Sequence, residues 1–293
     1  MKNIRKIFLR NAAGETYGLM GENGVYASGL SGLGFTLSPT FADLGRGFFI
    51  PVSDESEPQG TVSITVTFTR NPYPEYRNFV NWISAAGTLT LVYNPTGNQE
   101  FYREVVVNFL QKGELTKVGW LEVPCSVYCC TPWYQPSPTT LHLSNTANSV
   151  RKRYSYRYAV DLRYGLDSSA ALAGTIAGAG HIPGAIELTY YGAIINPQIR
   201  LTGNLSGKTY GICRIAVVLN SGDTLKLSTR HDNAYAKRIN AAGVETDLLD
   251  VLDLSTEPFF HIPIDEPCTV SVEADSQFSG DADLTVYYYF RSV

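Results

Sequence analysis

The side chains best suited to ligate a metal lie near the middle of the chain, where three cysteines precede a histidine: Cys125, Cys129, Cys130 and His142. A structural zinc site sets one pair of cysteines, two to four residues apart, against a second such pair. Cys125 and Cys129 have a permitted spacing, but the second pair is missing. A strand over 119–128 would place Cys125 among apolar neighbours, where a free thiol behaves as a small hydrophobic side chain. We therefore expect no metal site and no cofactor.

The nearest approach to a nucleotide-binding loop is segment 203–209. A phosphate-binding loop needs four residues between its glycines and a helix after them, so that backbone N–H groups surround the phosphates. Only three residues separate Gly203 from Gly207, and the residues that follow alternate like a strand. In the glycine-rich segment 29–34, Leu33 stands where a nucleophile elbow requires glycine. Both segments are therefore expected to be turns.

Acidic residues could in principle supply a glycoside hydrolase, which needs two carboxylates facing each other across a cleft. The 27 acidic residues offer too many pairs for spacing to select one. Asp247, Asp250 and Asp253 recur every third residue, and Asp281 and Asp283 are expected in a turn, but neither group matches a calcium-binding loop. The four histidines show no pattern of a catalytic pair. We therefore assign no catalytic residue and expect no enzyme.

The charge balance argues against several partners. The 23 basic and 27 acidic residues give a net charge of −4, whereas domains that bind duplex DNA usually carry a basic excess. Segment 151–157 mixes basic and aromatic residues as single-strand binders do, but on a strand the two kinds would face opposite sides. No uncharged apolar run approaches the 18 residues of a membrane span. The odd number of cysteines without a signal peptide is typical of reduced thiols in a cytoplasm. We expect neither sequence-specific nucleic-acid binding nor membrane insertion.

The first 130 residues read as strands with one helix. Segment 61–69 alternates apolar side chains with Thr and Ser, which is the period of a strand with one buried face. Those apolar residues are Val62, Ile64, Val66 and Phe68. Less regular runs predict further strands at 88–93, 101–110 and 119–128. The simplest fold for this part is a β-sandwich.

The helix is expected over 75–86. Tyr76, Phe79, Val80 and Ile83 recur at the spacing that places side chains on one helical face. Gly87 is well placed to end the helix in the left-handed conformation. This face should pack against the strand that begins at residue 61.

Three prolines between 131 and 139 predict a linker and divide the chain into domains 1–135 and 140–293. The second domain is again rich in strands, which are expected at 154–162, 185–191, 208–219, 224–229, 268–274 and 284–290. The small residues of 170–184 are expected to form a mobile loop. This pattern favours a jelly-roll or similar sandwich. The fold class is therefore mainly β.

A series of short motifs, in this order, resembles the distal tail proteins of long-tailed bacteriophages and prophages. The motifs are SGLGF at 31–35, GFFIPV at 47–52, FTRNP at 68–72, YRNFVNW at 76–82, LVYNP at 91–95, KGEL at 112–115 and WLEVPC at 120–125. Segments 191–201 and 221–225, with the closing aromatic strand, extend the likeness into the second half.

The resemblance implies a structural, non-catalytic protein at the tip of the virion tail, assembled in the host bacterial cytoplasm. The first domain, a β-sandwich with one helix, would close six copies into a ring. The second domain, a galectin-like or carbohydrate-module-like sandwich, would project outward. The implied partners are the tail tube protein, a tail-associated lysin or fibre, and a glycan of the host surface. A carbohydrate-binding β-sandwich protein and, less favoured, a glycoside hydrolase remain as alternatives.

The candidate ring interface is Phe48, Phe49 and Ile50, within segment 45–51. These apolar residues stand between glycines and the acidic segment 54–57, where no periodic pattern assigns them to a core. Exposed apolar clusters usually mark surfaces that bind a partner. The opposite interpretation, that they fill the core of their own sandwich, is equally compatible with the sequence.

Overall fold

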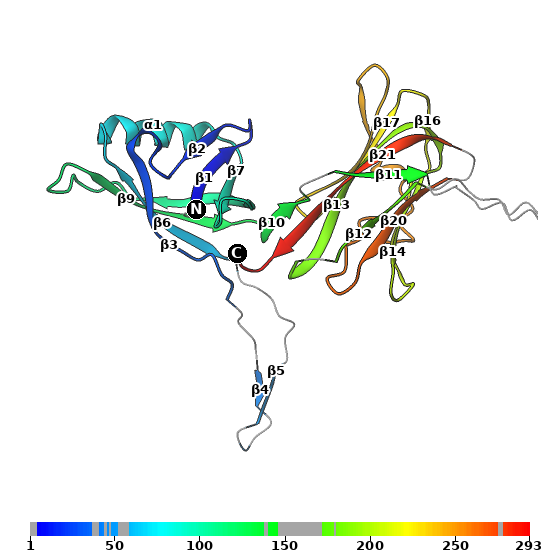
Figure 1. Ribbon diagram of the computed structural model, residues 1–293, viewed down its shortest axis with the longest axis horizontal. Helices are drawn as coiled ribbons and strands as arrows, with labels where there is room; N and C mark the ends of the chain where they lie inside the picture. The colour runs from blue at the N-terminus through cyan, green and yellow to red at the C-terminus, as the bar shows by residue number, and fades with distance from the viewer. Residues whose placement is uncertain are drawn as a thin grey trace, which may run out of the picture. The chain divides into compact units, whose positions relative to one another are not determined.

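The computed structural model of the chain divides into two compact units, Met1–Gln135 with Phe290–Val293, and Pro136–Tyr289 (Figure 1). The structure describes residues 5–36, 41–43, 46, 48–51, 59–137, 140–145, 172–178, 180–274 and 278–293, and at 22, 49, 51, 144, 145 and 279 it describes the backbone alone. The expected strand 154–162, the basic and aromatic segment 151–157 and the acidic segment 54–57 lie outside the described residues.

The first unit is an antiparallel sheet that folds back on itself. In spatial order its strands are β2 (Thr16–Gly18), β1 (Lys6–Asn11), β7 (Leu89–Asn94), β8 (Phe101–Leu110), β9 (Leu121–Cys129), β6 (Thr61–Phe68) and β3 (Val25–Ser31). The order closes at Leu19, whose N–H donates to the carbonyl of Ile7 and whose carbonyl accepts from the N–H of Ala27. The short strand β10 (Trp133–Pro136) pairs with β8. The inner faces of these strands therefore enclose one core.

The alternation expected in segment 61–69 is confirmed, because all four apolar residues of β6 are at most 5% exposed. Across β9, Val62 lies opposite Val127 and Ile64 lies opposite Cys125. Thr and Ser occupy the outward positions of β6. This strand therefore has one face in the core and one in solvent.

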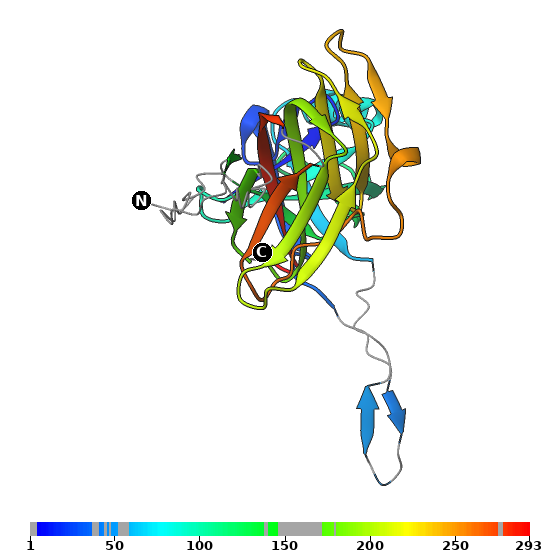
Figure 2. The same cartoon turned by 90° about the vertical axis from the view of Figure 1, so that its right-hand side faces the viewer.

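Between β3 and β6 the chain forms a separate two-stranded sheet, β4 (Phe41–Asp43) paired with β5 (Phe49–Pro51). Phe41 lies opposite Pro51 and Ala42 lies opposite Ile50, so the pair is an antiparallel hairpin (Figure 2). Arg46 lies between the two strands with a positive φ of 56°, a left-handed conformation typical of a tight turn.

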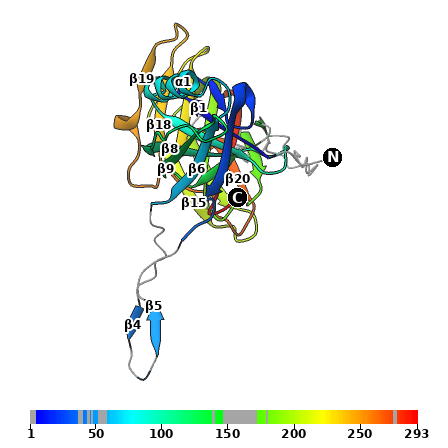
Figure 3. The same cartoon turned by 90° about the vertical axis from the view of Figure 1, so that its left-hand side faces the viewer.

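The expected helix is present as α1 (Pro72–Ala85), next to β1 and β2 in Figures 1 and 3. Pro72 opens it where the missing N–H would have no partner within the helix, and Gly87 follows it with φ 69°. Phe79 is fully buried, with its ring centroid 4.9 Å from that of Tyr17 and 5.8 Å from that of Phe68.

The helical face is rotated relative to the sequence prediction. Tyr76 and Ile83 pack on the core as expected, and so does Trp82, whereas Val80 is only half-buried outside it. The ring of Tyr17 lies 5.4 Å from Trp82 and provides its packing partner. Contact with this aromatic side chain of β2 turns Trp82, rather than Val80, towards the core.

The second unit is a sandwich of two antiparallel sheets (Figure 2). One sheet has the order β11 (Leu141–Asn145), β21 (Ser279–Phe290), β13 (Ile182–Ile195), β17 (Thr224–Arg230), β18 (Asn233–Ile239) and β19 (Glu245–Asp247). The other has the order β12 (Leu172–Ile176), β20 (Cys268–Glu273), β14 (Gln198–Gly203) and β15 (Thr209–Arg214). Strand β11 joins them, because residues 141–143 pair with β21 and residues 144–145 pair with β12. The short strand β16 (Val218–Leu219) and the 3-10 turn η2 (Leu249–Val251) complete the unit.

Two expectations for the second half are wrong. Residues 172–176 form strand β12 instead of a mobile loop, with Leu172 and Ile176 buried. A small residue is needed at Gly174, since a Cβ there would come within 2.6 Å of the side chain of Leu143. Asp281 and Asp283 lie on strand β21, not in a turn, and the fully buried Ala282 between them sets their outward direction.

Candidate functional site

The hairpin β4–β5 presents apolar side chains to solvent. Phe41 is 55% exposed, Phe48 is 68% exposed and Ile50 is 51% exposed. Phe48 and Ile50 are two residues apart, and Ile50 pairs with Ala42, so these three share one face, while Phe41 belongs to the other. The backbone of Phe49 lies in β5, but its side chain is outside the described part of the chain. Phe48 and Ile50 therefore do not fill the core of their own unit.

The outer face of the first unit's sheet carries a second exposed apolar pair. Val106 on β8 lies directly opposite Tyr128 on β9, and their exposed fractions are 56% and 41%. Cross-strand neighbours of this kind stand about 5 Å apart and act as one surface. The first unit thus offers two separate apolar surfaces, the hairpin and the Val106–Tyr128 pair.

The four residues considered for zinc are not brought together. Cys125 and Cys129 are buried in the core of the first unit, Cys130 is exposed, and His142 belongs to the second unit. Burial raises the pKa of the Cys125 thiol to about 11, which keeps the free thiol protonated at neutral pH. Among the residues that the structure describes, His, Cys, Asp and Glu form no group of three or more that could hold an ion.

Segment 203–209 is the turn between β14 and β15, as expected, and its amides bind a protein carboxylate. The N–H groups of Leu205 and Ser206 each donate to Glu266 at 3.0 Å, and the hydroxyls of Ser206 and Tyr210 donate to the same carboxylate. Hydrogen bonds from Tyr210 and then Ser206 lower the pKa of Glu266 to about 2. Glu266 therefore stays ionised and fixes this turn, a role that spacing could not reveal because 60 residues separate it from Ser206.

A histidine and two acids meet on the outer edge of the second unit. The Nδ1 atom of His142 lies 3.0 Å from Asp283, and its Nε2 atom lies 3.8 Å from Asp281. The hydrogen bond to Asp283 is the main cause that raises the pKa of His142. His142 and Asp283 are exposed to solvent, so they form a surface ion pair whenever the imidazole is protonated.

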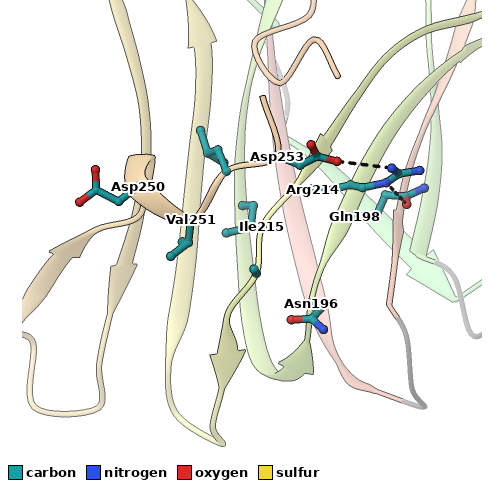
Figure 4. A pocket seen from close by; sticks show the side chains of 9 residues that line it. Asn196, Gln198, Arg214, Ile215, Asp250, Val251 and Asp253 are labelled. Carbon is teal, nitrogen blue, oxygen red and sulfur yellow. Dashed lines mark hydrogen bonds and ion pairs between the residues drawn. The ribbon is translucent and has the colours of Figure 1, made fainter. Parts of the chain in front are cut away.

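A hollow of about 650 Å³ lies beside the end of β15, where the chain passes η2. Figure 4 shows the guanidinium of Arg214 between Gln198 and Asp253, while Asp250 points away from this group. The Arg214 Nε atom donates to Gln198 Oε1 at 3.0 Å, and Nη1 lies 3.5 Å from Asp253 Oδ2. The floor is apolar, because Ile215 and Leu252 are buried there.

A glycosidase would place two carboxyl groups of this unit across a cleft. Such an enzyme needs one carboxyl group whose pKa is raised so that it can act as a general acid. Hydrogen bonds lower the pKa of Asp253, with those from Ser255 first, and they also lower the pKa of Asp223 and Glu266. Each of these three carboxyl groups is therefore unsuited to act as the general acid.

No described helix has the length and apolar character that crossing a membrane requires.

The family model of the distal tail protein N-terminal domain matches residues 6–130. No curated protein matches the sequence.

Solved structures of phage tail components share the fold over nearly the whole chain. A chain of the phage P2 baseplate in its activated conformation with calcium aligns with a TM-score of 0.65 and 13% identity, covering 99% of this chain and 100% of that one. The Dit protein of phage SPP1, described as a paradigm of the hub adsorption apparatus in phages that infect Gram-positive bacteria, aligns with a TM-score of 0.58 and 9% identity, covering 96% and 98%. Residues 6–130 therefore match the N-terminal domain of the distal tail proteins, and the whole chain shares the fold of these phage tail components.

Proposed function

We propose that this chain is a distal tail protein and that six copies of it close into a ring at the end of the phage tail. In this proposal the ring joins the tail tube protein to the tail fibre or the tail-associated lysin below it. The second unit is the outer domain and carries out no catalytic step, and assembly takes place in the host bacterial cytoplasm. The observation that carries the proposal is the hairpin β4–β5, which leaves Phe48 and Ile50 exposed within the unit that matches the family model.

A ring requires two different surfaces on each copy. Contacts between copies related by rotation about a ring axis are head-to-tail, so one face of a subunit meets another face of its neighbour. The hairpin supplies one apolar surface, and Val106 with Tyr128 supplies another on the outer face of the larger sheet. We propose that the hairpin of one copy contacts an apolar surface of the next copy. The first candidate for that surface is the Val106–Tyr128 pair.

Light scattering and electron microscopy of the purified chain test this assignment. We expect the natural protein to form rings, and Phe48→Asp to remain folded but monomeric, since a carboxylate in an apolar contact must be desolvated. Leu254→Asp is the matched control, because Leu254 is 76% exposed on the second unit and has no place in the proposed contact.

Two results would contradict the proposal at different levels. A natural protein that stays monomeric at high concentration, with no rings in micrographs, would refute the ring. Rings that persist in folded Phe48→Asp would keep the ring and reject the hairpin as its interface. Val106→Asp, read in the same way, tests the second surface separately.

A further inference from the structure

We infer that a hollow between helix α1 and the chain segment after strand β8 binds the acidic segment 54–57 of a second copy of this chain. The inference rests on the proposed function, because it names a place where one copy in the ring holds its neighbour. Three observations carry it: two cations in one hollow, an apolar lining between them, and the position of the acidic segment next to the hairpin β4–β5.

The hollow has a volume of about 460 Å³ and brings together two distant parts of the first unit. Helix α1 contributes Tyr73, Tyr76, Arg77 and Val80, and the segment between β8 and β9 contributes Lys112. The four helical positions have the spacing of one helical face. Val80, which lies outside the core, therefore forms part of the wall of this hollow.

Arg77 and Lys112 give the hollow a positive charge. Among the described residues, neither of them has a carboxylate partner in an ion pair. The Nζ atom of Lys112 lies 4.8 Å from the centroid of the Tyr73 ring, whose hydroxyl donates to Glu114 at 3.3 Å. Glu75 stands two residues before Arg77 and so points to a different side of α1. Two cations thus face one carboxylate, and an incoming carboxylate can pair with them.

The lining between the cations suits an acidic peptide. The rings of Tyr73 and Tyr76 and the aliphatic Val80 offer apolar surface, and Tyr73 is 40% exposed. Segment 52–58 reads VSDESEP, so three carboxylates lie within four positions and an apolar residue stands at each end. It contains no basic residue. Such a segment can pair its carboxylates with the cations and cover the rings at the same time.

The place where the acidic segment joins its own unit favours a second copy as its binding partner. The segment precedes β6, which begins at Thr61, whereas α1 follows the other end of β6 at Phe68. The seven steps between these two residues rise by about 23 Å. The acidic segment of a copy therefore enters its own sheet at the end opposite to α1.

The distance between the two proposed contacts matches the length of chain that connects them. In the proposed ring, Ile50 of one copy lies on Val106 of the next. Lys112 follows Val106 by six residues along β8 and its continuation, which corresponds to about 20 Å. Glu55 and Glu57 follow Ile50 by five and seven residues, and chains of these lengths span at most about 18 and 25 Å. A neighbour whose hairpin occupies the first contact can therefore bring its carboxylates to the hollow.

Disulfide cross-linking of the full chain tests the contact directly. The exposed Cys130 is first replaced by serine, and Glu55→Cys and Lys112→Cys are then made separately in this background. Because each chain carries only one of the two replacements, a mixture can join positions 55 and 112 only between copies. We expect a covalent dimer, with the linked peptides identified by mass spectrometry. Lys237→Cys in place of Lys112→Cys is the control and should give little linkage, since Lys237 is 40% exposed on the second unit.

Charge reversal tests the chemistry of the contact. An exposed ion pair changes an equilibrium constant by up to about fivefold. Reversing both cations in Arg77→Glu/Lys112→Glu should therefore raise the concentration at which half of the rings dissociate by roughly tenfold. Lys117→Glu is the matched control, because Lys117 is exposed in the same segment but does not line the hollow. Adding Asp54→Lys/Glu55→Lys to the double variant should restore assembly, which a merely structural defect would not allow.

Three results would overturn the inference. They are no linkage between positions 55 and 112 in a mixture that forms rings, reversal variants that are folded and assemble like the natural chain, and a combined variant that does not recover. A chain that carries both cysteine replacements and links only within itself would assign the hollow to its own segment and reject the second copy.

Light scattering of the same samples separates this inference from the proposed function. A ring without the linkage refutes only the contact of the acidic segment. A natural chain that stays monomeric and gives no linkage refutes the contact and the ring together. Thermal unfolding midpoints report whether each variant remains folded.

Discussion

Replacing Phe79 with alanine measures how firmly α1 is built into the first unit. The side chain is fully buried, and its ring packs between Tyr17 at 4.9 Å and Phe68 at 5.8 Å. A buried aromatic side chain removes at least about 150 Å² from water, which at roughly 25 cal/mol per Å² is worth about 4 kcal/mol. The alanine side chain retains a part of this free energy, but the cavity that it leaves adds a further cost. The total loss in the free energy of unfolding for such a substitution is usually about 3–5 kcal/mol. Because a whole domain is stable by only about 5–15 kcal/mol, we expect a large loss.

Tryptophan fluorescence during urea unfolding measures this loss in the first unit alone. The chain has three tryptophans, Trp82, Trp120 and Trp133, and all of them lie in that unit. Val80→Ala is the control on the same helix, and since Val80 is only half-buried its expected cost is below about 1 kcal/mol. A cost below about 1 kcal/mol for Phe79→Ala, or equal costs for the two variants, would refute the placement of α1 in the core.

Two further predictions concern Glu266. Its pKa is lowered from 4.5 to about 2, so its ionised form stabilises the second unit above pH 4.5, and this stabilisation is lost as the pH falls towards 2. The thermal midpoint of the second unit should therefore fall between pH 4.5 and 2 in the natural protein, and this part of the fall should be absent in Glu266→Gln. An unchanged pH dependence in Glu266→Gln would show that the turn does not hold the carboxylate by these hydrogen bonds. Gly203→Ala should lower the thermal midpoint of the second unit, because a Cβ at this position would overlap the Glu266 carboxylate. Gly34→Ala is the control and should leave this midpoint unchanged, because no atom lies within 4 Å of the Cβ that it adds. Equal midpoints for these two glycine variants would contradict the close approach.

Secondary structure is predicted best from the sequence for elements that have one face buried and the other exposed to solvent. Strand β6 alternates strictly because its Thr and Ser residues face solvent while Val62 and Phe68 enter the core. Strand β12 is not predicted from the sequence because the residue at its centre must have no side chain. Gly174 passes so close to Leu143 that no side chain fits between them, and a run of small residues is also the composition of a loop.

Contacts between distant segments explain the other differences. The helix period correctly places Phe79 in the core. It does not distinguish Val80 from Trp82 as the next residue to pack on the core, because that depends on the contact of Trp82 with Tyr17 on β2. Glu266 is one acidic residue among many in the sequence, and only the fold brings it to the amides of Leu205 and Ser206. The same is true of Gln198 and Arg214, which come together only because β14 pairs with β15.

The hairpin β4–β5 shows why an interface is harder to predict than a core. Apolar residues between glycines have the same composition whether their own core or a neighbour covers them, and the exposure of Phe41, Phe48 and Ile50 shows that they do not fill the core of their own unit. Fully burying Phe48 and Ile50, which share one face of the hairpin, contributes about 1.5–3 kcal/mol each, whereas association costs an estimated 4–15 kcal/mol. The hairpin alone therefore leaves little surplus for binding, and a stable contact between copies requires additional buried surface. This is the physical reason for expecting a second surface such as Val106 with Tyr128, and for expecting the proposed ring to form in a concentration-dependent way.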